Sequence, residues 1–242
     1  MKNLKLYQKI VFATAIVLIV ALTVSTVLLS LSLSKKDEPT YYEKKCNMFE
    51  LENVNFSHGQ IVFIGDSITD GCALDTFYPG LPLAVYNRGI GGDNSEGVLN
   101  RLKLSLFDIK PSKIVLMIGV NDINGKRSNE RILNAYEEIL KSISANLPTA
   151  EVFCISILPV NDTLSTYTSI NVDESNAQIL SINPEIKRLA DKYGYKFVDM
   201  YPEFADENNK LIEALSPDGI HLNSEGYKVY SKKLTPLLLQ ES

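Results

Sequence analysis

The chain has 242 residues, of which 45% are hydrophobic, and a formal net charge of −5. This length suits one globular domain with a smaller additional segment. The negative charge excludes a nucleic-acid-binding protein, because no cluster of lysine and arginine interleaved with aromatic residues is present to neutralise a phosphate backbone. Three widely spaced cysteines and two histidines give no metal site and no disulfide framework: Cys46, Cys72, Cys154, His58 and His221.

The amino-terminal segment predicts a membrane anchor. Residues 10–33 carry no charge and, as a helix rising about 1.5 Å per residue, are long enough to cross a bilayer. Lysines in residues 1–9 favour a cytoplasmic position for that segment, which leaves the remainder of the chain outside the cytoplasm at the cell membrane. A secretory signal that is cleaved to release the protein is the alternative, although its apolar region is usually shorter. Residues 34–57 are interpreted as a linker to a domain at 58–242.

Beyond the linker, short apolar runs alternate with segments of helical periodicity. Helical spacing follows a Ser128 cap and recurs after residues 93–95, and a final helix is expected near Ser224. Alternation of this kind predicts an α/β fold, a doubly wound parallel sheet covered by helices on both faces. Five strands are expected, at residues 61–64, 83–86, 114–118, 152–157 and 196–199.

One long polar segment, residues 158–182, is not predicted to form regular structure. Its length indicates a rim or lid of the functional site, and a surface insertion containing one short helix is an equal alternative. The pair Asn183 and Pro184 is interpreted as a cap followed by the first residue of the next helix.

Chemically distinctive residues follow the expected strands. The first strand runs directly into "GDS", which presents Ser67 at the carboxyl end of the sheet, where ligands bind in such folds. The second runs into the glycine-rich residues 87–93, the third into a segment with Asn121, and Asp218 and His221 precede the last helix. An aspartate can hold one nitrogen of a histidine while the other nitrogen faces a serine. Each motif alone is also common in ordinary turns and caps.

Taken together and in this order, the motifs "GDS", "NRGIGGD", "GVND" and "SPDGIH" resemble the four sequence blocks of the SGNH (GDSL-type) hydrolase superfamily. The flanking sequences are similar to its lysophospholipase-like and platelet-activating-factor-acetylhydrolase-like branch. The resemblance implies a three-layer, flavodoxin-like α/β/α sandwich. It also implies a catalytic triad with Ser67 as nucleophile, His221 as base and Asp218 as its orienter. By the same resemblance Ser67, Gly92 and Asn121 donate hydrogen bonds in an oxyanion hole.

Three functions are compatible with these motifs. We expect a membrane-anchored serine carboxylic-ester hydrolase that acts on acyl esters of carbohydrates or of lysophospholipid-type lipids without a cofactor or metal. An O-acyltransferase that passes the acyl group to a cell-envelope sugar is the alternative, because both reactions share the acyl-serine step. A catalytically silent binding domain is the third. Short acyl groups are favoured, and no obligate protein partner is predicted.

Overall fold

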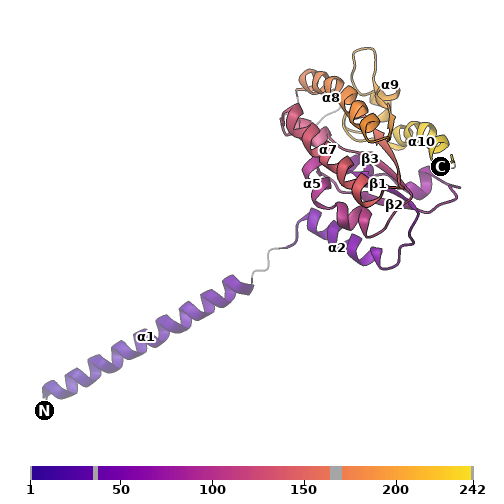
Figure 1. Cartoon of the computed structure of the whole chain (residues 1–242). Coiled ribbons are helices and arrows are strands. Elements are labelled where there is room, and N and C mark those ends of the chain that lie inside the picture. The colour runs from indigo at the N-terminus through magenta and orange to yellow at the C-terminus, as the bar shows by residue number, and fades with distance from the viewer. Residues whose placement is uncertain (1, 35–37, 164–170, 241–242) are drawn as a thin grey trace. The chain divides into compact units, whose positions relative to one another are not determined.

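The computed structural model describes residues 2–34, 38–163 and 171–240 and divides the chain into two compact units, residues 1–40 and 41–242 (Figure 1). In its described residues the first unit contains one helix, α1 (Lys2–Ser34), whose described side chains are exposed. Within it, Tyr7–Val27 is long and apolar enough to cross a membrane, by length and composition. The helix therefore fits the expected anchor and equally fits a signal sequence.

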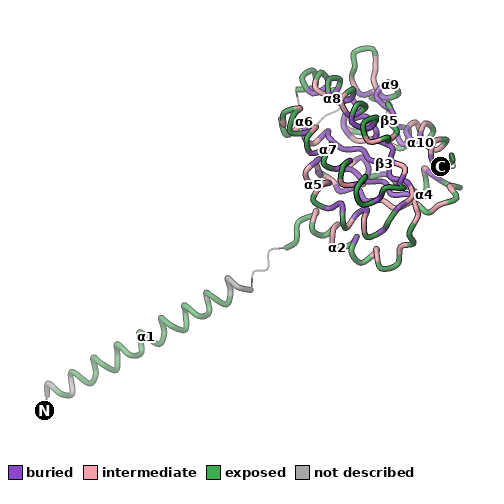
Figure 2. The backbone as a smooth tube through the Cα atoms, viewed as in Figure 1, coloured by how far each residue is buried: buried purple, intermediate pink, exposed green. Residues whose placement is uncertain are grey.

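The second unit is built on a five-stranded parallel sheet with the strand order β2-β1-β3-β4-β5. Its strands are β1 (Ile61–Gly65), β2 (Val85–Gly89), β3 (Lys113–Met117), β4 (Glu151–Ile155) and β5 (Lys196–Val198). All five expected strands are present, although β2 begins two residues later than expected. Every residue of β1 and β3 is buried, as the apolar runs predicted for strands covered on both faces (Figure 2).

The sheet is surrounded by the helices of this unit that the structure describes. They are α2 (Tyr41–Asn53), α3 (Ser67–Asp70), α4 (Leu74–Phe77), α5 (Ser95–Asn100), α6 (Val120–Asn124), α7 (Asn129–Asn146), α8 (Val172–Lys192), α9 (Tyr201–Phe204) and α10 (Ser224–Leu238). A π-helical turn (Lys103–Phe107) and a 3₁₀ turn (Glu213–Leu215) complete the described elements.

Alternate residues of each strand supply two separate hydrophobic cores. In β1, Val62 and Ile64 face the core formed with α5, α7 and α8, whereas Ile61 and Phe63 face the core formed with α3, α4 and α10. This separation follows from the two-residue repeat of a strand, which sends neighbouring side chains to opposite faces. The result is the three-layer α/β/α sandwich that the sequence predicted.

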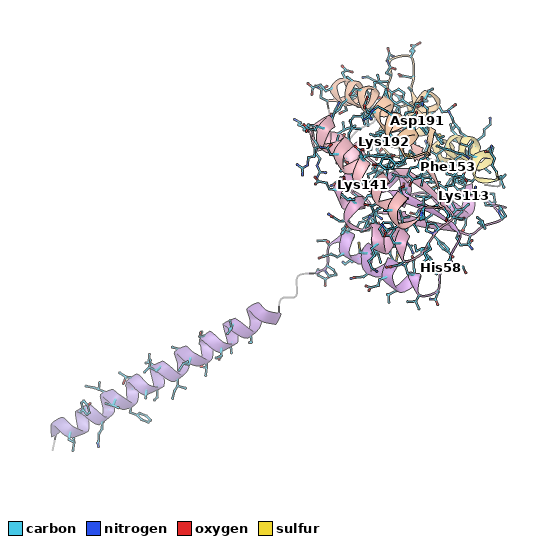
Figure 3. The ribbon with its side chains drawn as sticks, viewed as in Figure 1. His58, Lys113, Lys141, Phe153, Asp191 and Lys192 are labelled. Atoms are coloured by element: carbon cyan, nitrogen blue, oxygen red, sulfur yellow. The ribbon has the colours of Figure 1, made fainter. Side chains whose placement is uncertain are left out.

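The amino-terminal ends of the strands lie opposite to the end of the sheet at which Ser67 emerges. Ion pairs connect β3, β4 and β5 there. Lys113, which begins β3, lies 2.5 Å from Glu151 of β4, and Lys196 of β5 pairs with the same carboxylate. Both lysines also lie over the ring of Phe153, and Figure 3 labels Lys113 and Phe153. His58, which Figure 3 labels, is exposed in the turn before β1.

Residues 41–57, which were expected to belong to a linker, instead form part of the second unit. Residues Tyr41–Asn53 make helix α2, and the side chain of Phe49 within it is completely buried. The carboxylate of Glu52 pairs with Arg88 of β2 at 2.6 Å. The linker prediction was wrong here because the partners that hold α2 come from distant parts of the chain.

Helix α8 corrects the expectation for residues 158–184, where a long irregular segment was predicted to end at Asn183. It begins at Val172, with Asn171 as its cap, and continues through Pro184 to Lys192. The expected start, with Asn183 as cap and Pro184 as first helical residue, was wrong because the helix already runs from Val172. Asn183 instead faces inward and bonds the backbone N–H of Ile157 at 2.8 Å and its carbonyl at 3.0 Å. Of the expected lid, residues 164–170 lie outside the described residues.

Candidate active site

Ser67 is placed by the tight junction between β1 and α3. Asp66 caps the helix, and its Oδ1 accepts a hydrogen bond from the backbone N–H of Ile68 at 3.0 Å. Gly65 is required just before it, since a Cβ there would collide with the carbonyl oxygen of Met117 and the side chain of Thr69. The serine is partly exposed, while Asp66 beside it is buried.

The structure brings the three expected triad residues together in one hydrogen-bonded chain. The Nε2 atom of His221 lies 2.9 Å from Oγ of Ser67, and its Nδ1 atom lies 2.6 Å from Oδ2 of Asp218. The separation of 154 residues between Ser67 and His221 is bridged because the loop before α10 reaches the carboxyl end of β1. The arrangement has the geometry in which an imidazole accepts the serine proton.

The loop that carries Asp218 and His221 is rigidly bonded. The other carboxylate oxygen of Asp218 accepts from the backbone N–H of Ile220 at 3.0 Å and of His221 at 2.8 Å. Ser216 donates its hydroxyl to the carbonyl of His221 at 2.6 Å and accepts from the N–H of Gly219 at 2.8 Å. This role of Ser216 was not predicted, although its place in the "SPDG" motif was a turn signal.

Gly92, the second expected oxyanion donor, lies exposed in the turn that follows β2. Its φ of +78° is one that residues with side chains rarely adopt, and no heavy atom lies within 4 Å of the position a Cβ would take. The turn is attached to the serine junction because the N–H of Ile90 donates to the carbonyl of Gly65 at 3.1 Å. The conformation, more than lack of space, therefore favours glycine here.

Asn121, the third expected donor, lies in the first turn of α6. Its side-chain nitrogen donates to the backbone carbonyl of Asp93 at 2.8 Å, which places its amide beside the residue that follows Gly92. Asp122 next to it is fully buried and accepts from the N–H of Ser95 at 2.9 Å and from Arg127 at 2.8 Å. The aspartate thus braces the loops around the site, as a residue outside the triad would.

A buried arginine that the sequence analysis did not single out joins the same loops. Arg101 is 3% exposed, and its guanidinium donates to Asp93 at 2.7 Å, to the carbonyl of Arg88 at 2.7 Å and to the carbonyl of Gly65 at 2.9 Å. It therefore fixes the end of β1, the end of β2 and the glycine turn relative to one another. Its charge is compensated by Asp93, which is also buried.

The pKa values of Asp66 and Asp218 are shifted in opposite directions. Burial raises the pKa of Asp66 to about 7, more than its hydrogen bond from Ile68 lowers it. Burial also acts to raise the pKa of Asp218, but hydrogen bonds from His221 and Ile220 outweigh it and hold that pKa below its usual value. Asp218 is therefore ionised at neutral pH, as an aspartate that orients a histidine must be.

A polar groove of about 340 Å³ adjoins the glycine turn. Its lining combines an aromatic ring with amide, carboxylate and guanidinium groups, supplied by Tyr42, Asn94, Glu96, Asn100 and Arg127 beside residues 91–93 and Gly97. Within the described residues no group of three histidines, cysteines, aspartates or glutamates is arranged to hold a metal ion. The positive charge of Arg127 is balanced by Asp122 and Glu96, so the groove has no strong net charge.

Comparison with known proteins places this geometry in context. The model of the GDSL-like Lipase/Acylhydrolase family matches residues 63–229. Platelet-activating factor acetylhydrolase IB subunit alpha2 of Rattus norvegicus is 28% identical over 183 residues, which cover 74% of this chain and 76% of the relative. A solved structure from Streptococcus pneumonia, described as a candidate platelet activating factor, is 30% identical and covers 89% of this chain and 99% of its own, with a TM-score of 0.75. A GDSL-like lipase of Bacteroides thetaiotaomicron, 21% identical, shares the fold with a TM-score of 0.70, covering 82% of this chain and 98% of its own.

Proposed function

We propose, from the premise that this chain belongs to the GDSL-like lipase/acylhydrolase family and is a serine carboxylic-ester hydrolase, that it removes short acyl groups from sugar hydroxyls through an acyl-enzyme formed on Ser67. The observation that carries the assignment of residues is the continuous hydrogen-bonded chain from Asp218 through His221 to Ser67.

The first half-reaction forms the acyl-serine. With the imidazole proton on Nδ1 and directed to Asp218, the Nε2 atom of His221 takes the hydroxyl proton as Oγ of Ser67 attacks the ester carbonyl. When the tetrahedral intermediate collapses, the bond to the alcohol breaks and His221 returns the proton to the leaving oxygen. Asp218, which stays ionised, stabilises the imidazolium between these two transfers.

The second half-reaction releases the acid. Water donates a proton to His221 and attacks the acyl carbonyl, and the proton then returns to Oγ of Ser67 as the acid leaves. In both steps negative charge collects on the carbonyl oxygen. The proposed donors to that oxygen are the backbone N–H groups of Ser67 and Gly92 and the N–H of the Asn121 amide that is not directed to Asp93.

The proposed substrate class follows from the groove beside Gly92. A sugar offers many hydroxyl groups to planar amide, carboxylate and guanidinium side chains, and its apolar face can lie against an aromatic ring such as that of Tyr42. The balanced charge of the groove favours a neutral alcohol over a phosphorylated one. The relative named as an acetylhydrolase supports a short acyl group.

The cellular setting is part of the proposal. Helix α1 would hold the enzyme at the cell membrane, with residues 1–9 in the cytoplasm and the catalytic unit outside it. Such an anchor is compatible with a substrate in envelope polysaccharide and with a lysophospholipid in the membrane itself. The sugar ester is preferred because of the polar groove, and the lipid ester is the competing outcome of the test below.

A hydrolysis panel on the full chain in detergent tests the proposal. The substrates are p-nitrophenyl esters of increasing acyl length, an acetylated neutral oligosaccharide and a lysophospholipid. We expect the acetylated sugar and the acetate ester to be cleaved fastest, and Ser67→Ala to lose at least about 10³-fold in rate. The control is Ser224→Ala, which changes an exposed serine that also begins a helix. Full activity of Ser67→Ala would refute the assignment, and faster cleavage of the lysophospholipid would reverse the substrate class.

The same assay separates hydrolysis from acyl transfer. Transfer to a second sugar uses the same acyl-serine and replaces water as the acceptor, so an unacetylated oligosaccharide is added in excess. Under our proposal free acid remains the main product. Accumulation of acylated acceptor above free acid would identify an acyltransferase instead.

A further inference from the structure

The carboxylate of Asp70 connects helix α2 to the glycine turn of the active site. Asp70 ends the short helix that Ser67 begins. Its Oδ2 atom accepts from the hydroxyl of Tyr41 at 2.6 Å and from the backbone N–H of Gly91 at 2.9 Å, and its Oδ1 atom accepts from the ammonium of Lys45 at 2.7 Å. One carboxylate thus bonds two side chains of α2 and the residue immediately before Gly92.

The contact between α2 and the turn is also steric. A Cβ placed on Gly91 would lie 3.3 Å from Cε1 of Tyr41 and 3.6 Å from Oδ2 of Asp70, so the backbone of the turn runs directly along the tyrosine ring. The hydroxyl of Tyr42 donates to the carbonyl of Gly97 at 3.3 Å, on the helix that follows the turn. Two consecutive tyrosines therefore hold the two sides of this loop.

The far end of α2 is fixed independently. Arg88 is 1% exposed and bonds Glu52 at 2.6 Å and Asn53 at 2.7 Å, and its guanidinium lies 4.4 Å from the centre of the Phe49 ring. Phe49 itself is buried. With one end anchored on β2, α2 presents Tyr41 and Lys45 to Asp70 in a defined position.

The chemistry of the Asp70 contacts suits a positioning role. Hydrogen bonds between a carboxylate and charged or strongly polar donors are short and directional. The hydrogen bond to Asp70 raises the pKa of Tyr41 to about 12, so the phenol keeps its proton and donates throughout the physiological range. The side chains of Lys45 and Asp70 are only 16% and 14% exposed, which limits screening by solvent.

We propose that α2 is a working part of the active site, in which Tyr41 and Lys45 act through Asp70 to hold Gly91 so that the N–H of Gly92 is aimed at the oxyanion. Asp70 is the positioning residue, and Tyr41 and Lys45 support it. The inference rests on the proposed role of Gly92 in ester cleavage. It predicts that a change on α2 lowers the rate of the chemical step while substrate binding is retained.

The test compares Tyr41→Phe, Lys45→Met and Asp70→Asn in the full chain, with kcat, KM and Tm measured for p-nitrophenyl acetate. We expect kcat to fall about 10-fold in each variant with KM within about twofold, because a misdirected donor is lost in the transition state more than in the ground state. Tyr41→Phe and Asp70→Asn combined should lower kcat little more than either alone, since both break one connection.

Matched controls separate an effect on the position of Gly92 from a general loss of stability. Tyr193→Phe removes a phenol that lies 3.5 Å from Glu137, and Lys113→Met removes a similarly buried ion pair to Glu151 at the end of the sheet opposite to Ser67. We expect them to change Tm by about as much as the α2 variants and to leave kcat unchanged. Tyr41→Phe removes a single hydroxyl group, so it remains informative if Asp70→Asn fails to fold.

Two results would overturn the inference while the proposed function stands. One is Ser67→Ala losing activity while Tyr41→Phe keeps its full kcat. The other is the α2 variants and the controls losing kcat in equal proportion to Tm, which would show a purely structural helix. Activity that survives Ser67→Ala would instead count against the proposed function.

Discussion

Nδ1 of His221 lies 2.6 Å from Oδ2 of Asp218, and the other oxygen of the same carboxylate bonds the backbone N–H of His221. The aspartate thus fixes both the ring and the main chain of the residue that it orients. A change at Oδ2 alone, the oxygen that contacts Nδ1, should leave the loop folded and still alter the imidazole tautomer.

Asp218→Asn is therefore expected to lower kcat by about 10⁴-fold, the loss that the corresponding change causes in serine-protease triads. The amide oxygen can still accept from Ile220 and His221, so Tm should change little. Asp206→Asn is the control, because Asp206 makes the same kind of turn by accepting from the N–H groups of Asn208 and Lys210, both at 2.8 Å. Equal kcat in the two variants would remove Asp218 from the mechanism.

Gly92 and Gly59 form a natural pair for testing the oxyanion turn. Both have a φ of +78° and no heavy atom within 4 Å of an added Cβ. An alanine at either position should cost about 1 kcal/mol of stability through backbone strain alone. Only Gly92→Ala should also lower kcat, by at least about tenfold, because relief of the strain turns its N–H away. If Gly59→Ala impairs catalysis as much, the effect is one of stability and the donor role is lost.

Asp66 predicts a particular dependence of stability on pH. Its pKa is raised from 3.8 to about 7 in the folded protein, so folding retains a proton that the unfolded chain releases above its own pKa. The contribution of Asp66 to stability must therefore fall as pH rises between these two values, by up to about 4 kcal/mol at 1.4 kcal/mol per pKa unit. Asp66→Asn keeps an acceptor for Ile68 and cannot titrate. The difference in unfolding free energy between variant and parent should grow across that range and level off above it; a constant difference contradicts the raised pKa.

Asn183 should be among the most costly polar residues to remove from α8. Its amide satisfies both the N–H and the carbonyl of Ile157, which lies in the buried segment after β4. Asn183→Ala leaves two buried backbone groups without partners, each worth about 1–3 kcal/mol, and a loss of about 2–4 kcal/mol is expected in urea unfolding. Asn146→Ala, which removes one exposed bond to the carbonyl of Ser142, should cost less than about 1 kcal/mol. Similar losses would mean that water reaches Ile157.

The strands and the triad were accessible from the sequence for a physical reason. Buried parallel strands have to be continuous apolar runs, and the polar residues at their carboxyl ends meet at one edge whatever lies between them. Ser67 could therefore be placed at that edge without knowing the helices, whereas Asp218 and His221, which precede the last helix, were joined to it by the resemblance to the SGNH sequence blocks. The structure places the three side chains in hydrogen-bond contact, and their catalytic roles remain the proposal tested above.

The helices that were missed obey rules that depend on distant partners. In α2, the contribution of Glu52 depends on a buried Arg88, and sequence alone does not show that this arginine is buried. In α8, Asn176 and Asn183 are buried and bond the segment after β4. Because asparagine is common in loops, the sequence predicted a loop where these side chains face the core. Pro184 added a second misleading signal, because proline inside a helix is uncommon.

The 154 residues that separate Ser67 from His221 have a consequence for refolding. The two side chains meet only after every strand crossover between them has formed and the last helix has docked, and contacts so distant in sequence are slow to form. Ester cleavage should thus recover later than the circular dichroism of the helices when the denatured protein is diluted. The recovery of ester cleavage would then report when the final step of folding is complete.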